Sequence, residues 1–135
     1  MKKYLLLLLC TVTIGLSSCK KEVIVPETGN RTIILDIKPE EWQISGDRLG
    51  FYKDISVPEN TPYFNDNGHV VVSMAFDDPN IFEGLPQVYQ GVTYRYSAEP
   101  DFVTVYIGNA NGTPAARPTG TVTAKVTLID GILID

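Results

Sequence analysis

The chain has 135 residues, of which 44% are hydrophobic and 20% are charged, and its formal net charge is −5 at pH 7. This length suits one domain with a single sizeable core. The acidic balance argues against nucleic acid and anionic lipid headgroups as partners.

Residues 1–18 have the three-part organisation of a secretory signal peptide. Lys2 and Lys3 give a positive start, an apolar stretch that includes residues 5–9 follows, and small residues stand at its end. The stretch is short for a membrane-spanning helix, which needs about 20 apolar residues. We therefore expect it to be a processing signal and not part of the fold.

The ending Leu16-Ser17-Ser18-Cys19 resembles the lipobox of bacterial lipoproteins. The resemblance implies that Cys19 carries the lipid and begins the mature protein. Each acyl methylene buried in a bilayer contributes about 0.8 kcal/mol, so two or three chains would hold the protein on a membrane. We expect a lipid-anchored envelope protein of the outer membrane, on its periplasmic or its surface side. An ordinary secretory signal or a signal anchor is the alternative.

The cysteine count excludes a disulfide in the expected mature chain. Cys10 leaves with the signal peptide, and the sulfur of Cys19 carries the lipid. Loss of Lys2 and Lys3 changes the net charge from −5 to about −7. Residues 20–30 contain a proline and a glycine and lack sustained periodicity, so we expect residues 19–30 to form the lipidated tether.

From Arg31 onward, apolar residues recur with the period of two that is typical of half-buried β-strands. In residues 49–57, the predicted inward residues are Leu49, Phe51, Ile55 and Val57, with Lys53 as the exception. The complete set of predicted strands is residues 32–37, 49–57, 69–76, 92–96, 102–107 and 121–129.

Turn chemistry separates these strands. Asn-Gly pairs end residues 65–68 and 109–112, and such pairs tolerate the positive φ of tight turns. Residues 39–41 predict one short helical turn, and Thr61-Pro62 predicts a cap and first position of another. We therefore expect residues 31–135 to form one all-β domain, an antiparallel two-sheet β-sandwich of immunoglobulin-like or related type, with one or two short helical turns.

A series of short motifs resembles uncharacterised small lipoproteins of Bacteroidota-type bacteria. The resemblance spans nearly the whole expected mature chain and implies a β-sandwich on a lipid anchor, without a catalytic residue to carry over. The motifs are Trp42, residues 50–58 (GFYKDISVP), residues 68–72 (GHVVV), Leu85-Pro86, residues 94–96 (YRY) and residues 125–129 (KVTLI).

The sequence predicts no catalytic residue, metal site or cofactor. His69 is the single histidine, which excludes multi-histidine metal sites, and no Gly-x-Ser-x-Gly elbow accompanies it. Acid pairs within residues 77–80, 40–41 and 99–101 stand where turns favour acids for conformational reasons. Residues 66–68 lack the oxygen spacing of a calcium loop, and residues 108–113 lack the lysine of a phosphate loop.

Aromatic residues are the one feature that favours binding. In residues 102–107, Val103, Val105 and Ile107 form the aliphatic face, so Phe102 and Tyr106 point the other way. Tyr52 lies opposite Phe51 in the same manner. We therefore nominate Tyr52, Phe102 and Tyr106 as candidate binding residues, unless a loop such as residues 79–90 covers them. We expect the Trp42 side chain to cover one end of the sandwich.

These observations rank three functions. The first is a non-catalytic binding or interaction module whose partner is a glycan or an envelope protein. The second is a structural or accessory subunit of an envelope assembly, and the third is a carboxylate-based glycosidase. An exposed aromatic patch flanked by polar groups would favour the first, a bare edge strand the second, and two facing carboxylates in a cleft the third.

The anchor can be tested by replacing the lipid-carrying residue. Cys19→Ala should abolish the uptake of radiolabelled palmitate by the protein in its host, because no other acceptor sulfur stands at the cleavage site. Cys10→Ala, which changes a residue of the signal peptide, should leave that uptake intact. A wild-type protein that takes up no palmitate would contradict the lipoprotein interpretation.

Overall fold

A computed structural model describes residues 29–131 and residue 134. The predicted signal peptide, Cys19 and all but the last two residues of the predicted tether lie outside the described residues. The first strand begins at Arg31, where the domain was predicted to start. No helix in the described part of the chain is long and apolar enough to cross a membrane.

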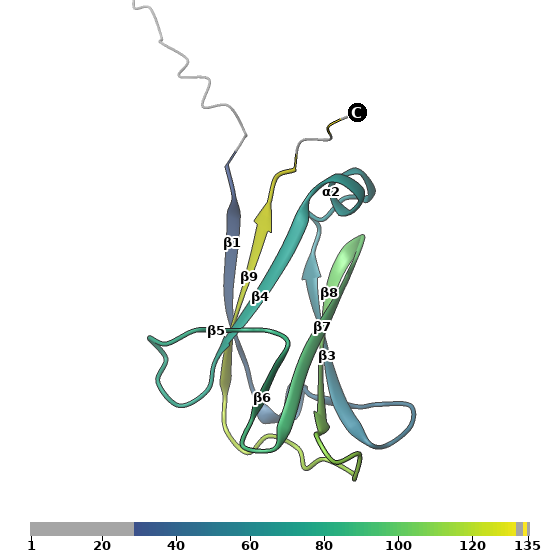
Figure 1. Ribbon diagram of the computed structural model, residues 1–135, viewed down its shortest axis with the longest axis vertical. Coiled ribbons are helices and arrows are strands. Elements are labelled where there is room, and N and C mark those ends of the chain that lie inside the picture. The colour runs from purple at the N-terminus through teal and green to yellow at the C-terminus, as the bar shows by residue number, and fades with distance from the viewer. Residues whose placement is uncertain (1–28, 132–133, 135) are drawn as a thin grey trace, which may run out of the picture.

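The domain consists of two antiparallel β-sheets that face each other, which confirms the predicted β-sandwich (Figure 1). One sheet has four strands in the order β1-β9-β4-β5. Their bounds are β1 Arg31–Ile37, β4 His69–Ala75, β5 Glu83–Gly84 and β9 Val122–Ile129.

The second sheet has five strands in the order β2-β3-β8-β7-β6, with β8 at its centre. The register aligns Gly50 with Gly108 and Gly108 with Thr93 across the three long strands. The bounds are β2 Gln43–Ile44, β3 Gly50–Val57, β6 Gln87–Tyr89, β7 Val92–Glu99 and β8 Asp101–Asn109.

Two short helical elements agree with the predicted turns. The 3-10 helix η1, Pro39–Glu41, begins with proline, and the backbone N–H of Lys38 donates to the Glu41 carboxylate at 2.8 Å. Helix α2, Pro62–Asn67, is capped by the Thr61 hydroxyl, which accepts from the backbone N–H of Phe64. The prediction of a tight turn at residues 65–68 is wrong. Residues 65–67 complete α2, and Gly68 follows as the C-cap of this helix with φ −93°.

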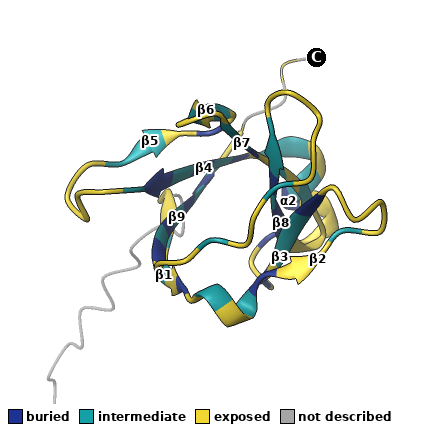
Figure 2. Ribbon diagram, turned by 90° about the horizontal axis from the view of Figure 1, so that it is seen from below, coloured by how far each residue is buried: buried dark blue, intermediate teal, exposed yellow. Residues whose placement is uncertain are grey.

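Alternating side chains of both sheets build the core between them. Along β9, Val122, Ala124, Val126 and Leu128 are buried while the residues between them are partly exposed, as the pattern predicted. Figure 2 shows this alternation of buried and more exposed residues along the facing strands. Leu49 is an exception to the predicted inward set, because β3 begins only at Gly50 and Leu49 lies in the preceding turn, 42% exposed.

Specific polar contacts hold the two sheets and their connections together. The Tyr96 hydroxyl in β7 donates to the carbonyl of Val70 in β4 at 2.8 Å, so it links one sheet to the other. In the β8–β9 connection, the Arg117 guanidinium lies 5.0 Å from the Phe51 ring centre and donates to the carbonyls of Pro39 and Trp42. Arg117 therefore fixes this connection to η1, and Trp42 beside it is buried in the core.

The two ends of the sandwich carry different elements. Arg31 pairs with Leu128 and His69 with Ile129, so the start of β1 and α2, which precedes His69, lie at the same end (Figure 1). The β2–β3 turn and the β8–β9 connection lie at the opposite end. At ~3.4 Å per residue, a nine-residue strand such as β8 separates the two ends by roughly 30 Å.

The burial pattern predicts which apolar side chains stabilise the fold. Met74→Ala should lower the free energy of unfolding by about 2–5 kcal/mol, because Met74 is fully buried in the core. Ile34→Ala should cost less than about 1 kcal/mol, since Ile34 is 62% exposed. Urea denaturation measures both, and equal losses for the two variants would contradict the placement of the core.

Candidate functional site

The outer face of the five-stranded sheet carries a row of large polar side chains. Residues that pair across antiparallel strands share a face of the sheet. Tyr52 in β3 pairs with Tyr106 in β8, and Tyr106 pairs with Arg95 in β7. The three side chains therefore form one row across the three longest strands of this sheet, on the face that points away from the core.

Neighbouring side chains determine how far each nominated aromatic residue is exposed. Tyr52, Phe102 and Tyr106 all lie on this outer face, as predicted, and Phe102 is 44% exposed. Tyr52 and Tyr106 are only half-buried. The Tyr52 hydroxyl donates to Gln43 Oε1 at 2.7 Å, and Arg95 covers Tyr106, with its guanidinium carbon 4.0 Å from the ring centre.

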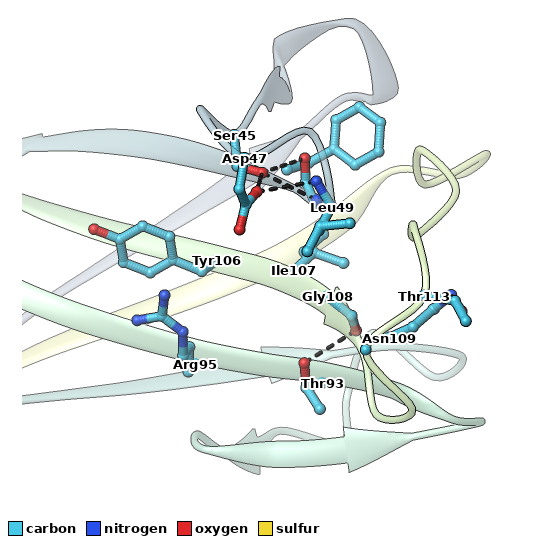
Figure 3. Close-up of a pocket in the computed structure, with 13 residues that line it drawn as sticks. Ser45, Asp47, Leu49, Thr93, Arg95, Tyr106, Ile107, Gly108, Asn109 and Thr113 are labelled. Atoms are coloured by element: carbon cyan, nitrogen blue, oxygen red, sulfur yellow. Dashed lines mark hydrogen bonds between the residues drawn. The ribbon is translucent and has the colours of Figure 1, made fainter.

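At the end of the sandwich opposite α2, this outer face has a hollow of about 160 Å³ (Figure 3). Its floor consists of backbone, because Gly50 and Gly108 pair there without side chains. A Cβ atom at Gly50 would lie 2.0 Å from the carbonyl oxygen of Ile107, so only glycine fits this position. Thr93 stands beside Gly108 and donates its hydroxyl to the carbonyl of that residue at 3.0 Å.

The β2–β3 turn forms one wall of the hollow. The Oδ1 atom of Asp47 accepts from the Ser45 hydroxyl at 2.6 Å and from the backbone N–H of Leu49 at 2.9 Å. Ser45 also bonds to both backbone polar groups of Gly50, and Arg48 takes a positive φ of 59° in the turn. These contacts fix the direction of the Asp47 carboxylate.

The β8–β9 connection forms another wall. The side-chain amide of Asn109 donates to the Thr113 hydroxyl at 3.1 Å and to the carbonyl of Pro114 at 2.9 Å. Gly112 follows Asn111 with φ +75°, which confirms the tight turn predicted for residues 109–112. Arg117 fixes the same connection to η1, so this wall is held from both sides.

Two opposite charges face the hollow. Hydrogen bonding from Ser45 is the main cause that lowers the pKa of Asp47 below its ordinary value of 3.8, and the positive charge of Arg95 lowers it further. Figure 3 shows Asp47 and Arg95 on either side of Tyr106. Within residues 29–131, the guanidinium of Arg95 has no carboxylate within ion-pair distance, and its stacking on Tyr106 is the contact that holds it.

The lining of the hollow does not contain the two facing carboxylates that a glycosidase uses. A single carboxylate, Asp47, lines it. Two of the acids that stand in pairs in the sequence have other partners: Glu41 accepts from Lys53 at 3.1 Å, and Asp78 accepts from the backbone and side chain of Asn80. Within the described residues, no group of three or more His, Cys, Asp or Glu side chains is arranged to hold a metal ion.

Three other depressions differ in chemistry from this hollow. One of about 580 Å³ lies on the far side of the β2–β3 turn, with Arg48 as its charged residue. Another, of about 210 Å³, lies between α2 and β7 and includes exposed His69, at the start of β4 as predicted. The last, of about 190 Å³, contains Asp77, whose carboxylate accepts from the Tyr89 hydroxyl and thereby raises the pKa of Tyr89.

The sequence nominated Tyr106 but missed the groups that surround it. Arg95 lies in β7, and its contact with Tyr106 follows from the pairing of β7 with β8, which its own strand does not reveal. Asp47 lies in a turn that no strand pattern covers.

No family model, curated protein or solved structure significantly similar to the chain was found.

The hydrogen bond from Ser45 predicts how Asp47 titrates. Ser45→Ala removes a donor that favours the ionised carboxylate, so the pKa of Asp47 should rise toward 3.8. Ser56→Ala, an exposed change on β3 away from the turn, should leave that pKa where it is in the wild type. Carbon-detected NMR titration measures the pKa, and a wild-type Asp47 that titrates at or above 3.8 would contradict this geometry.

Proposed function

We propose that the protein is a lipid-anchored, non-catalytic binding protein of the cell envelope, with its ligand held in the hollow at the end of the five-stranded sheet. The observation that carries the proposal is the Arg95 guanidinium, which stacks on Tyr106 and faces a hollow of about 160 Å³ with no described carboxylate paired to it. A cation held in place beside unfilled space is a typical element of a recognition site.

The position of the hollow supports the same proposal. The domain begins at Arg31, at the end of the sandwich that carries α2. The hollow lies at the other end, between the β2–β3 turn and the β8–β9 connection. If Cys19 holds the chain on a membrane, β1 extends away from the anchored segment and the hollow opens roughly 30 Å farther out, where a soluble or polymeric ligand can reach it.

A second candidate function rests on β1. This strand pairs only with β9, so its other edge has no partner in the described sheet, and Ile34 on its outer face is 62% exposed. Unpaired edges are common sites of strand addition by other chains. The structural-subunit function predicted second from the sequence would use this edge.

In-cell photo-crosslinking separates the two candidates. The full-length protein would carry p-benzoylphenylalanine in place of Leu49, which is exposed at the rim of the hollow, or in place of Ile34 on β1. A binding function at the hollow predicts an adduct with an envelope component at position 49 and none at position 34. An adduct only at position 34 would support the assembly function instead, and no adduct at position 49 would contradict the proposal.

A further inference from the structure

Resting on the proposed binding function, we infer that the hollow recognises one unit of an uncharged sugar, through a pair of adjacent hydroxyl groups placed between Asp47 and Arg95. The carboxylate accepts a hydrogen bond and the guanidinium donates one, and neither group is engaged with the other at ion-pair distance. Two neighbouring hydroxyls present a donor and an acceptor in the same small space.

The charges of the hollow disfavour ligands that carry a net charge. A carboxylate or phosphate that approached Arg95 would also approach Asp47, whose lowered pKa keeps it ionised at neutral pH. A cation that approached Asp47 would meet the guanidinium of Arg95. The two walls together therefore favour a polar ligand without net charge.

The floor of the hollow offers no edge at which an extended peptide could add as a strand. Peptides bind to sheets by adding a strand at an unpaired edge. Here the floor is the middle of the sheet, where Gly50, Gly108 and Thr93 lie on three strands that pair with one another. A ligand must therefore be compact and must bond to side chains, and a sugar ring meets both requirements.

The size of the hollow limits the ligand to about one ring. Sites for drug-sized molecules enclose about 300–1,000 Å³. The hollow measures about 160 Å³, which is below this range. Because the hollow is open toward solvent, the remainder of a longer glycan can continue past Leu49 and Thr113 at its rim.

The polar groups are fixed before any ligand arrives. Ser45 and the Leu49 N–H hold Asp47, the Tyr106 ring supports Arg95, and bonds within its own loop hold Asn109. Side chains that are already ordered lose little conformational freedom on binding, so each hydrogen bond contributes more to affinity. The same organisation requires the backbone floor at Gly50, where a side chain would displace the Ile107 carbonyl.

A glycan array tests the inference with the purified full-length protein in detergent. The array carries neutral mono- and disaccharides, their uronic-acid counterparts and sulfated forms. We expect binding to at least one neutral sugar, weakened about tenfold or more by Asp47→Asn and by Arg95→Gln. Lys125→Gln, which changes an outward residue on the other sheet beside Phe82, should bind as the wild type does.

Two results would overturn the inference. A preference for uronic acids or sulfated sugars that Asp47→Asn strengthens would make this an anion site governed by Arg95. Absence of binding to every sugar would remove the sugar as ligand. In either case an adduct at position 49 in the crosslinking experiment would leave the proposed binding function standing, whereas absence of that adduct would remove the function as well.

Discussion

The inward packing of β8 is the constraint on which the site depends. Val103 and Val105 are fully buried and Ile107 is 4% exposed, so one face of this strand belongs to the core. Because side chains alternate along a strand, Tyr106 and Gly108 must then lie on the outer face. β8 is the central strand of its sheet, and its register places Arg95, Tyr52 and Gly50. A shift of one residue would bury Tyr106 and remove the hollow.

The same contacts that close the sandwich also shape the hollow. The end of β8 supplies Asn109 to one wall, and the β8–β9 connection supplies Thr113. This connection then reaches η1 through Arg117, which donates to the carbonyls of Pro39 and Trp42. On the other side, Ser45 bonds to Gly50 at the start of β3 and orients Asp47. Both walls are therefore tied to the ends of strands whose inner faces are in the core. A site built in this way gains its order from the fold and needs no disulfide.

The sequence predicted the parts of the fold that have a long periodic signal. The six long strands, both helical turns and, apart from Leu49, the inward faces agree with the structure, because burial on one face imposes a period of two over seven to nine residues. β2, β5 and β6 were missed, since strands of two or three residues are too short to show a period.

The site was predicted only in part for a related reason. Tyr106 could be placed outward from its own strand, but its contact with Arg95 depends on the register between strands, and the direction of Asp47 depends on a turn.

If the outer face of the five-stranded sheet holds the ligand, as proposed, ligand binding should leave the core between the sheets unchanged. Hydrogen exchange of the full-length protein, followed by mass spectrometry with and without a saturating neutral glycoside, tests it directly. We expect slower exchange in the β2–β3 turn and from Asn109 into the β8–β9 connection, and unchanged exchange in β4 and β9. Protection along the edge of β1 with none around the hollow would contradict it.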